Sequence, residues 1–94
     1  MGKRRAAMPV FLAEHYAPGL DERRVEALTR RLRAATGPQA ATDVRFLGCA
    51  GLPGDESFLS IFAAPSLEAV IRLVEQADVT ADRIVPALWR AGDG

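Results

Sequence analysis

The most constraining feature of this sequence is the segment 57–63, Ser-Phe-Leu-Ser-Ile-Phe-Ala, which has the length and composition of a strand. Phe58 and Phe62 fall on one face of this strand and Leu59 and Ile61 on the other, because successive side chains of a strand alternate. An antiparallel strand with one face in water would alternate between apolar and polar residues. The pattern therefore predicts that both faces of this strand are covered.

Three other segments also have the character of strands. We expect them over 9–16, 44–50 and 84–89, and Pro86 places the last one at a sheet edge because proline cannot donate to a strand ladder. The glycine- and proline-containing stretch 51–56 predicts a hairpin-like connection between the second and third strands.

Two segments predict amphipathic helices. The first helix begins after Asp21, a favourable N-cap, and ends at Gly37-Pro38, while the second begins after the N-cap Ser66. The apolar stripes consist of Val25, Leu28, Leu32 and Ala35 in the first helix and of Leu67, Val70, Ile71, Val74 and Ala77 in the second.

The expected order of elements is βαββαβ, which is typical of a ferredoxin-like two-layer α+β sandwich. In a chain of 94 residues this leaves room for one domain, over 8–90, between a flexible leader, 1–7, and a flexible tail, 91–94. The two helices cover one face of such a sheet, and the chain has no further element for the other. A homodimer of the dimeric α/β-barrel type, packed sheet to sheet, is therefore the simplest prediction.

Composition excludes several classes of protein. Twelve basic and twelve acidic residues balance, which argues against nucleic acid or an anionic membrane as a general partner. A single cysteine excludes a disulfide within the chain, and no apolar run approaches the roughly 20 residues of a membrane span. The sequence contains no phosphate-binding loop, dinucleotide fingerprint or nucleophile elbow. We therefore expect a soluble cytoplasmic protein.

Four segments with matching order and spacing carry a resemblance to a known family: Pro9–Gly19, Arg45–Gly48, Phe62–Ser66 and Asp82–Ala87. They resemble a small bacterial family of ferredoxin-like proteins whose members are described as nickel-binding or as uncharacterised. The resemblance extends over residues 8–90 and implies the same fold. It also implies that the chain binds a transition metal, with nickel as the possible cofactor.

Five residues are the candidate ligands of such a metal. His15, Glu14 and Cys49 form the predicted set, and Asp55 and Glu56 in the turn are peripheral oxygen donors. Imidazole together with a soft thiolate suits nickel or zinc. A dimer interface would double the number of ligands available.

The same residues also have purely structural interpretations. His15 is the only histidine and follows Glu14 directly, so on a strand the two side chains point to opposite faces. It would then be a polar residue where the strand leaves the sheet. Cys49, on the face of Arg45, would be a small buried apolar residue, and Glu14 would form an ion pair with Arg45 or Arg83.

The alternative hypothesis is that the chain is an enzyme that needs no cofactor. The sequence leaves open whether the chain is an enzyme at all. In that hypothesis the dimer encloses a cavity for an apolar or aromatic metabolite. Glu14 or His15 transfers a proton, Tyr16 or Arg45 holds a substrate oxygen, and Trp89 forms a wall. Proton abstraction, cyclisation or isomerisation would each be possible with this set.

Overall fold

The computed structural model describes residues 8–90 and 92, so the expected leader and most of the expected tail lie outside the described residues. Within them the order of elements is βαββαβ, as the sequence predicts, with a short 3₁₀ helix between the second and third strands. The elements are β1 (Val10–Tyr16), α1 (Glu22–Thr36), β2 (Arg45–Leu52), η1 (Pro53–Asp55), β3 (Ser57–Ala63), α2 (Leu67–Gln76) and β4 (Arg83–Ala87).

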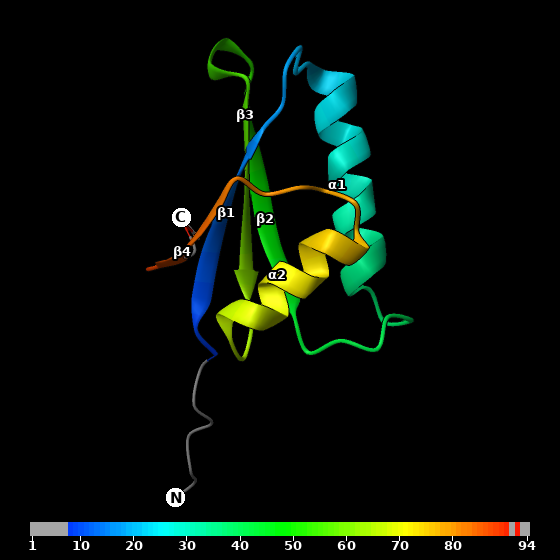
Figure 1. The fold of residues 1–94 in the computed structure, drawn as a ribbon, viewed down its shortest axis with the longest axis vertical. Helices are drawn as coiled ribbons and strands as arrows, with labels where there is room; N and C mark the ends of the chain where they lie inside the picture. The colour runs from blue at the N-terminus through cyan, green and yellow to red at the C-terminus, as the bar shows by residue number, and fades with distance from the viewer. Residues whose placement is uncertain (1–7, 91, 93–94) are drawn as a thin grey trace, which may run out of the picture.

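The four strands form one antiparallel sheet in the order β2-β3-β1-β4. The strand with two apolar faces, β3, lies inside the sheet, while β4 with Pro86 lies at an edge as predicted. Both helices pack on the same side of the sheet (Figure 1). This is a two-layer ferredoxin-like α+β sandwich.

Both helices begin where the sequence predicts. The Asp21 carboxylate accepts a hydrogen bond from the backbone N–H of Arg24 at 2.8 Å, and the Ser66 hydroxyl accepts one from that of Ala69 at 3.2 Å. In the described part of the chain, no helix has both the length and the apolar character needed to cross a membrane.

The buried face of α2 differs from its predicted stripe. Val70 and Val74 of that stripe are buried, but Leu67 and Ile71 are each 38% exposed, and Leu73, which the stripe did not include, is buried. Leu73 replaces them because positions 70, 73, 74 and 77 also follow the i, i+3, i+4, i+7 spacing, on a stripe rotated toward the sheet.

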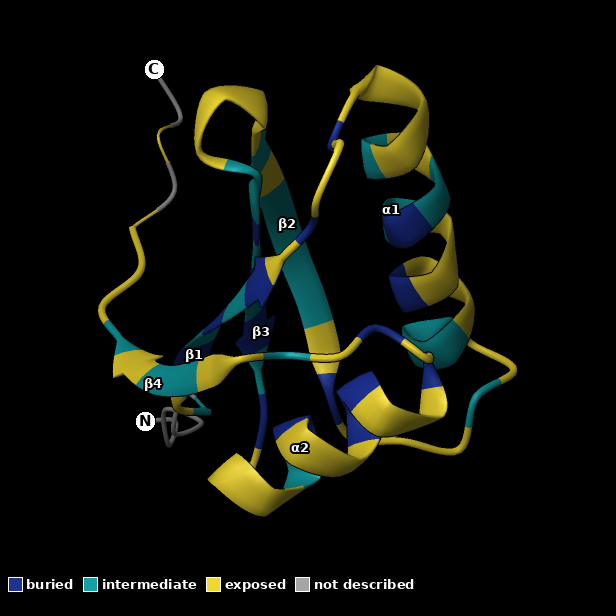
Figure 2. Cartoon of the chain, turned by 45° about the horizontal axis from the view of Figure 1, so that its top comes forward, coloured by how far each residue is buried: buried dark blue, intermediate teal, exposed yellow. Residues whose placement is uncertain are grey.

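The core lies between the sheet and the helices, where Figure 2 shows the buried segments. Burial along β1 and β3 alternates strictly: Phe11, Ala13 and His15 are buried on the helix side, as are Phe58 and Phe62 of β3. The opposite side of the sheet, which we call the open face, carries half-buried apolar side chains. They include Leu12 of β1 and Leu59 and Ile61 of β3.

A β-bulge in β2 changes which face its residues occupy. Phe46 pairs with Phe62, but the next pair joins Gly48 to Ile61, so Leu47 is the extra residue. The alternation is therefore reversed from Gly48 onward. Arg45 lies on the open face and Cys49 on the helix face, and the prediction that they share a face was wrong.

Two strand boundaries also differ from the predictions. The second strand continues to Leu52, because Gly51 and Leu52 still pair with β3, and the turn shrinks to η1. The last strand, by contrast, ends at Ala87, so Trp89 lies beyond the sheet ladder.

Candidate functional site

The open face carries an apolar pocket of about 340 Å³. Residues of three strands and one residue beyond the sheet line it: Leu12, Gly48, Cys49, Ala50, Leu59, Ile61 and Trp89. Gly48 and Ala50 leave the space above β2, since their side chains are absent or small. Trp89 is 41% exposed and forms one wall, which is the place that the enzyme hypothesis gave it. We call this cavity the open-face pocket.

Glu14 and Tyr16 lie on the same face, toward one end of the sheet. Glu14 pairs across the ladder with Leu59, a pocket residue, and with Arg83. The Glu14 carboxylate lies 3.9 Å from the Arg83 guanidinium, and both side chains are about half exposed. Of the two ion pairs considered from the sequence, the structure therefore shows the one with Arg83.

Arg45 belongs to the opposite end of the open face. It pairs with Ala63, the last residue of β3, whereas Tyr16 pairs with Ser57, the first. Tyr16 is 64% exposed, and its backbone N–H donates to the Asp82 carboxylate. The two residues proposed to hold a substrate oxygen thus lie at different ends of the sheet, and only Tyr16 is near Glu14.

His15 is buried on the helix face and has a partner at each ring nitrogen. It is 3% exposed. Nδ1 lies 2.9 Å from the Thr80 carbonyl oxygen and Nε2 lies 2.8 Å from the Ser60 hydroxyl, which is fully buried. A carbonyl oxygen only accepts, so Nδ1 carries a hydrogen. In the neutral ring Nε2 is then an acceptor, and the Ser60 hydroxyl donates to it.

Burial lowers the pKa of His15 below its ordinary value of 6.5, because the charged imidazolium would lose its hydration. The hydrogen bond to the Thr80 carbonyl and the negative charge of Asp82 act in the opposite direction but are outweighed. The ring is therefore neutral near pH 7. A neutral, fully hydrogen-bonded imidazole has no free lone pair for a metal ion.

The structure does not bring the three predicted metal ligands together within one chain. His15 and Cys49 face the helices on different strands, and Glu14 faces the other way. The Cys49 sulfur lies 3.2 Å from the Thr29 hydroxyl of α1, at half-buried depth. Among residues 8–90 and 92, no three histidine, cysteine, aspartate or glutamate side chains are grouped as a metal site would need.

The acidic residues of the turn also have a structural place. Glu56 adopts a left-handed conformation with φ of 52°. Its carboxylate accepts a hydrogen bond from the Gly19 N–H at 2.8 Å, and its carbonyl accepts one from Ala17 at 2.7 Å. Glu56 thereby ties the loop after β1 to the turn after β2. Asp55 is exposed at the end of η1.

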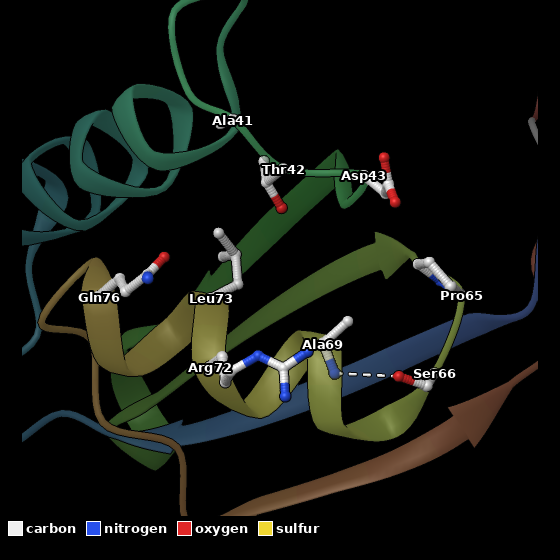
Figure 3. Close-up of a pocket in the computed structure, with 9 residues that line it drawn as sticks. All are labelled: Ala41, Thr42, Asp43, Pro65, Ser66, Ala69, Arg72, Leu73 and Gln76. Carbon is white, nitrogen blue, oxygen red and sulfur yellow. Dashed lines mark hydrogen bonds between the residues drawn. The ribbon is translucent and has the colours of Figure 1, made fainter.

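Another cavity, of about 310 Å³, lies between α2 and the loop before β2 (Figure 3). None of the residues that the sequence singled out for a metal or a substrate lines it. The Ser66 hydroxyl at its rim is already used as the helix cap. We therefore place the candidate site on the open face.

Sequence reasoning missed the partners of His15. Ser60 and Thr80 are separated from it by 45 and 65 residues, so no local motif joins them. One signal was present. Ser60 occupies an inward position of β3 between Phe58 and Phe62, and a buried hydroxyl in such a row needs a polar partner.

The fold defines the class of the protein, a ferredoxin-like α+β domain in which no helix or strand among residues 8–90 covers the apolar open face of the sheet. No family model and no curated protein matches the chain. A solved structure does: the crystal structure of SCO4226 from Streptomyces coelicolor A3(2), with a TM-score of 0.72. The two are 23% identical over 87% of this chain and 99% of that one, so the likeness supports the fold.

Proposed function

We propose that the chain binds a small apolar molecule in the open-face pocket and that a second copy of the chain closes this pocket. The carrying observation is the cavity of about 340 Å³ between Leu12, Leu59, Ile61 and Trp89. Ligand sites are concave and mostly apolar, with a few polar groups that orient the ligand. Glu14, which pairs with the pocket residue Leu59, and its partner Arg83 are polar groups beside the pocket, and Tyr16 lies farther along the same face.

The apolar surface around the pocket supports closure by a second copy. Tyr16 is 64% exposed and Leu52 37% exposed, and both pair with Ser57 at the same end of the sheet. They extend the apolar area beyond the pocket residues Leu59 and Ile61. Burying this area between two sheets would stabilise a dimer by removing apolar surface from water. The pocket would then be enclosed between the copies.

Glu14 is the group that we assign to proton transfer if the ligand is a substrate. It is the carboxylate on the open face next to the pocket residue Leu59. His15 does not fit this role, since its ring lies on the other face and both nitrogens are occupied. Glu14→Gln keeps the shape of the side chain but removes its basicity. A variant that folds and turns over the ligand at the wild-type rate would remove Glu14 from the chemistry.

The binding proposal is tested with one pair of matched variants. Ile61→Lys places a charge in the pocket, whereas Ile71→Lys makes the same change at an exposed position of α2. The uncharged dye Nile red serves as the apolar probe. Trp89, the only tryptophan of the chain, reports by its fluorescence whether the pocket is occupied. Light scattering gives the mass of each protein in solution and so its oligomeric state.

We expect wild type and Ile71→Lys to be dimers that bind the dye saturably with a change in Trp89 emission. Ile61→Lys should be a monomer without saturable binding. Circular dichroism of all three proteins shows that loss of binding is not loss of fold. A monomeric wild-type protein would refute closure by a second copy. Unchanged dye binding by Ile61→Lys would refute the assignment of the pocket.

Nickel binding, which the family resemblance implies, stays a prediction with its own test. One chain does not gather His15, Glu14 and Cys49, and a nickel ion at His15 would require its Nε2 to give up the Ser60 hydrogen bond. The experiment is nickel uptake by chelator-treated protein, compared with His15→Ala. Stoichiometric uptake that is lost in the variant would support a site at His15. Equal uptake by both proteins would exclude His15 as a ligand.

A further inference from the structure

A third cavity, of about 340 Å³, lies on the helix side of the sheet, between α1, the end of β1 and the segment after α2. Its walls include Arg24, Leu28 and Arg31 of α1 and Asp78 and Thr80 of the segment opposite, with the buried His15 also lining it. We call it the arginine pocket. It shares no lining residue with the open-face pocket.

Arg31 is held in place by the backbone rather than by a strong ion pair. Its Nη1 donates to the Asp78 carbonyl oxygen at 2.9 Å. A guanidinium has five N–H donors, so one such bond fixes the group and leaves further donors available. The Asp78 carboxylate is 4.0 Å away, with its side chain 91% exposed, and a pair of this kind is weak because water screens it. A better-placed anion can therefore compete with it.

Arg24 occupies a position that helix electrostatics disfavours. It lies in the first turn of α1, where the helix dipole favours negative charge, as Glu22 in the same turn illustrates. Within the described part of the chain no carboxylate pairs with the Arg24 guanidinium. Arg24 and Arg31 are seven residues apart, two helical turns, and so lie on the same side of α1. A cation placed against the local preference, next to a cavity, is the type of exception that accompanies function.

We propose that the arginine pocket binds a small oxyanion, the phosphate or carboxylate group of a metabolite, between Arg24 and Arg31. Arginine suits such groups because its planar donors match two oxygens at once. Two positive charges and the single exposed carboxylate of Asp78 leave the charged groups that line the pocket net positive. The hydrogen-bonded Thr80 carbonyl is already occupied by His15, so its lone pairs oppose an incoming anion less than a free carbonyl would.

The only histidine of the chain provides the reporter for this site. His15 lines the pocket, and because the chain has one histidine its Hε1 proton gives one assignable signal in NMR spectra. The protein is titrated separately with inorganic phosphate and with acetate, each compared with sodium chloride at matched ionic strength and constant pH. We expect a saturable shift of the His15 resonance with at least one of the two oxyanions. The one that saturates at lower concentration distinguishes a phosphoryl from a carboxylate ligand.

Arg24→Ala should weaken this binding by at least about fivefold, since a charge-assisted hydrogen bond is lost. Arg30→Ala is the matched control, an exposed arginine of the same helix that does not line the cavity, and should bind like wild type. A shift that does not saturate, or that chloride reproduces, overturns the proposal. So does equal affinity of Arg24→Ala and wild type. Because Ile61→Lys leaves this pocket intact, it should retain oxyanion binding even where apolar binding fails.

Discussion

The hydrogen bond between Ser60 and His15 offers a direct test of how the core tolerates polar groups. In Ser60→Ala the hydroxyl that donates to Nε2 is removed and little else changes, because alanine has the same Cβ. His15 keeps its bond from Nδ1 to the Thr80 carbonyl, so the ring stays in the same tautomer. Its Nε2 then has a buried lone pair without a donor.

The expected cost follows from the burial of both partners. Ser60 is fully buried and His15 is 3% exposed, so water cannot replace the lost donor without opening the core. Leaving a buried acceptor unsatisfied costs about 1–3 kcal/mol. A domain of this size loses about 4–8 °C in melting temperature for each kcal/mol. We therefore expect Ser60→Ala to melt roughly 4–24 °C below wild type.

Ser57→Ala is the matched control on the same strand. The Ser57 hydroxyl makes only a long contact of 3.4 Å with the Asp55 carbonyl in an exposed setting, so its removal should change stability by less than about 0.5 kcal/mol. The assay is thermal unfolding, with urea unfolding for the free energy, of wild type and both variants at equal protein concentration, so that any association is the same in all three. A Ser60→Ala variant as stable as Ser57→Ala would refute the assigned donor role of Ser60.

Three further predictions concern stability. The free energy of unfolding should fall as the pH is lowered below 6.5, by at most about 1.4 kcal/mol per pH unit, because His15 in the unfolded chain takes up a proton before the buried ring does. Urea unfolding of wild type and His15→Gln between about pH 7 and about pH 5 measures this, and a flat wild-type profile would contradict it. Asp78→Gly should stabilise the fold by about 0.5–1 kcal/mol and so raise the melting temperature, since φ of 59° is unfavourable for a residue with a Cβ. A lower melting temperature would contradict this and would mean that the contacts of the Asp78 side chain contribute more to stability than the strain costs. Gly51→Ala should cost about 1–3 kcal/mol because its Cβ would lie 2.5 Å from Val25 Cγ2, whereas Gly54→Ala meets no atom within 4 Å; equal unfolding midpoints for the two would disprove the clash.

The order and faces of most elements are predictable because they depend on local patterns. The caps Asp21 and Ser66 both act as the sequence indicates, and Pro86 is found in an edge strand. Strict alternation along β1 correctly places Glu14 and His15 on opposite faces. These features need only side-chain chemistry and the period of the backbone.

The orientation of Cys49 was not predictable in this way. Counting by twos from Arg45 places both on one face, but the bulge at Leu47 adds a residue and reverses every later position. A bulge is a property of two paired strands. The sequence of β2 alone therefore does not predict the bulge. The predicted metal ligand set included Cys49, so it was affected by the same wrong assignment of the face on which Cys49 lies.

The environment of His15 depends on even more distant partners. Whether a histidine on a strand is a ligand, a base or a packed core residue is decided by what meets its two nitrogens. Here the loop after α2 supplies Thr80 and β3 supplies Ser60. Only the inward serine between two phenylalanines pointed toward this outcome.

The alternation of β1 also separates the two functional hypotheses physically. Glu14 and His15 are adjacent in sequence, yet one belongs to the open face with Arg83 and the other to the core with Ser60. A single site in one chain cannot use both side chains without unravelling the strand. Chemistry on the open face therefore rests on Glu14 and its neighbours. His15 in turn can respond to the arginine pocket, where a bound anion would alter the field at its ring.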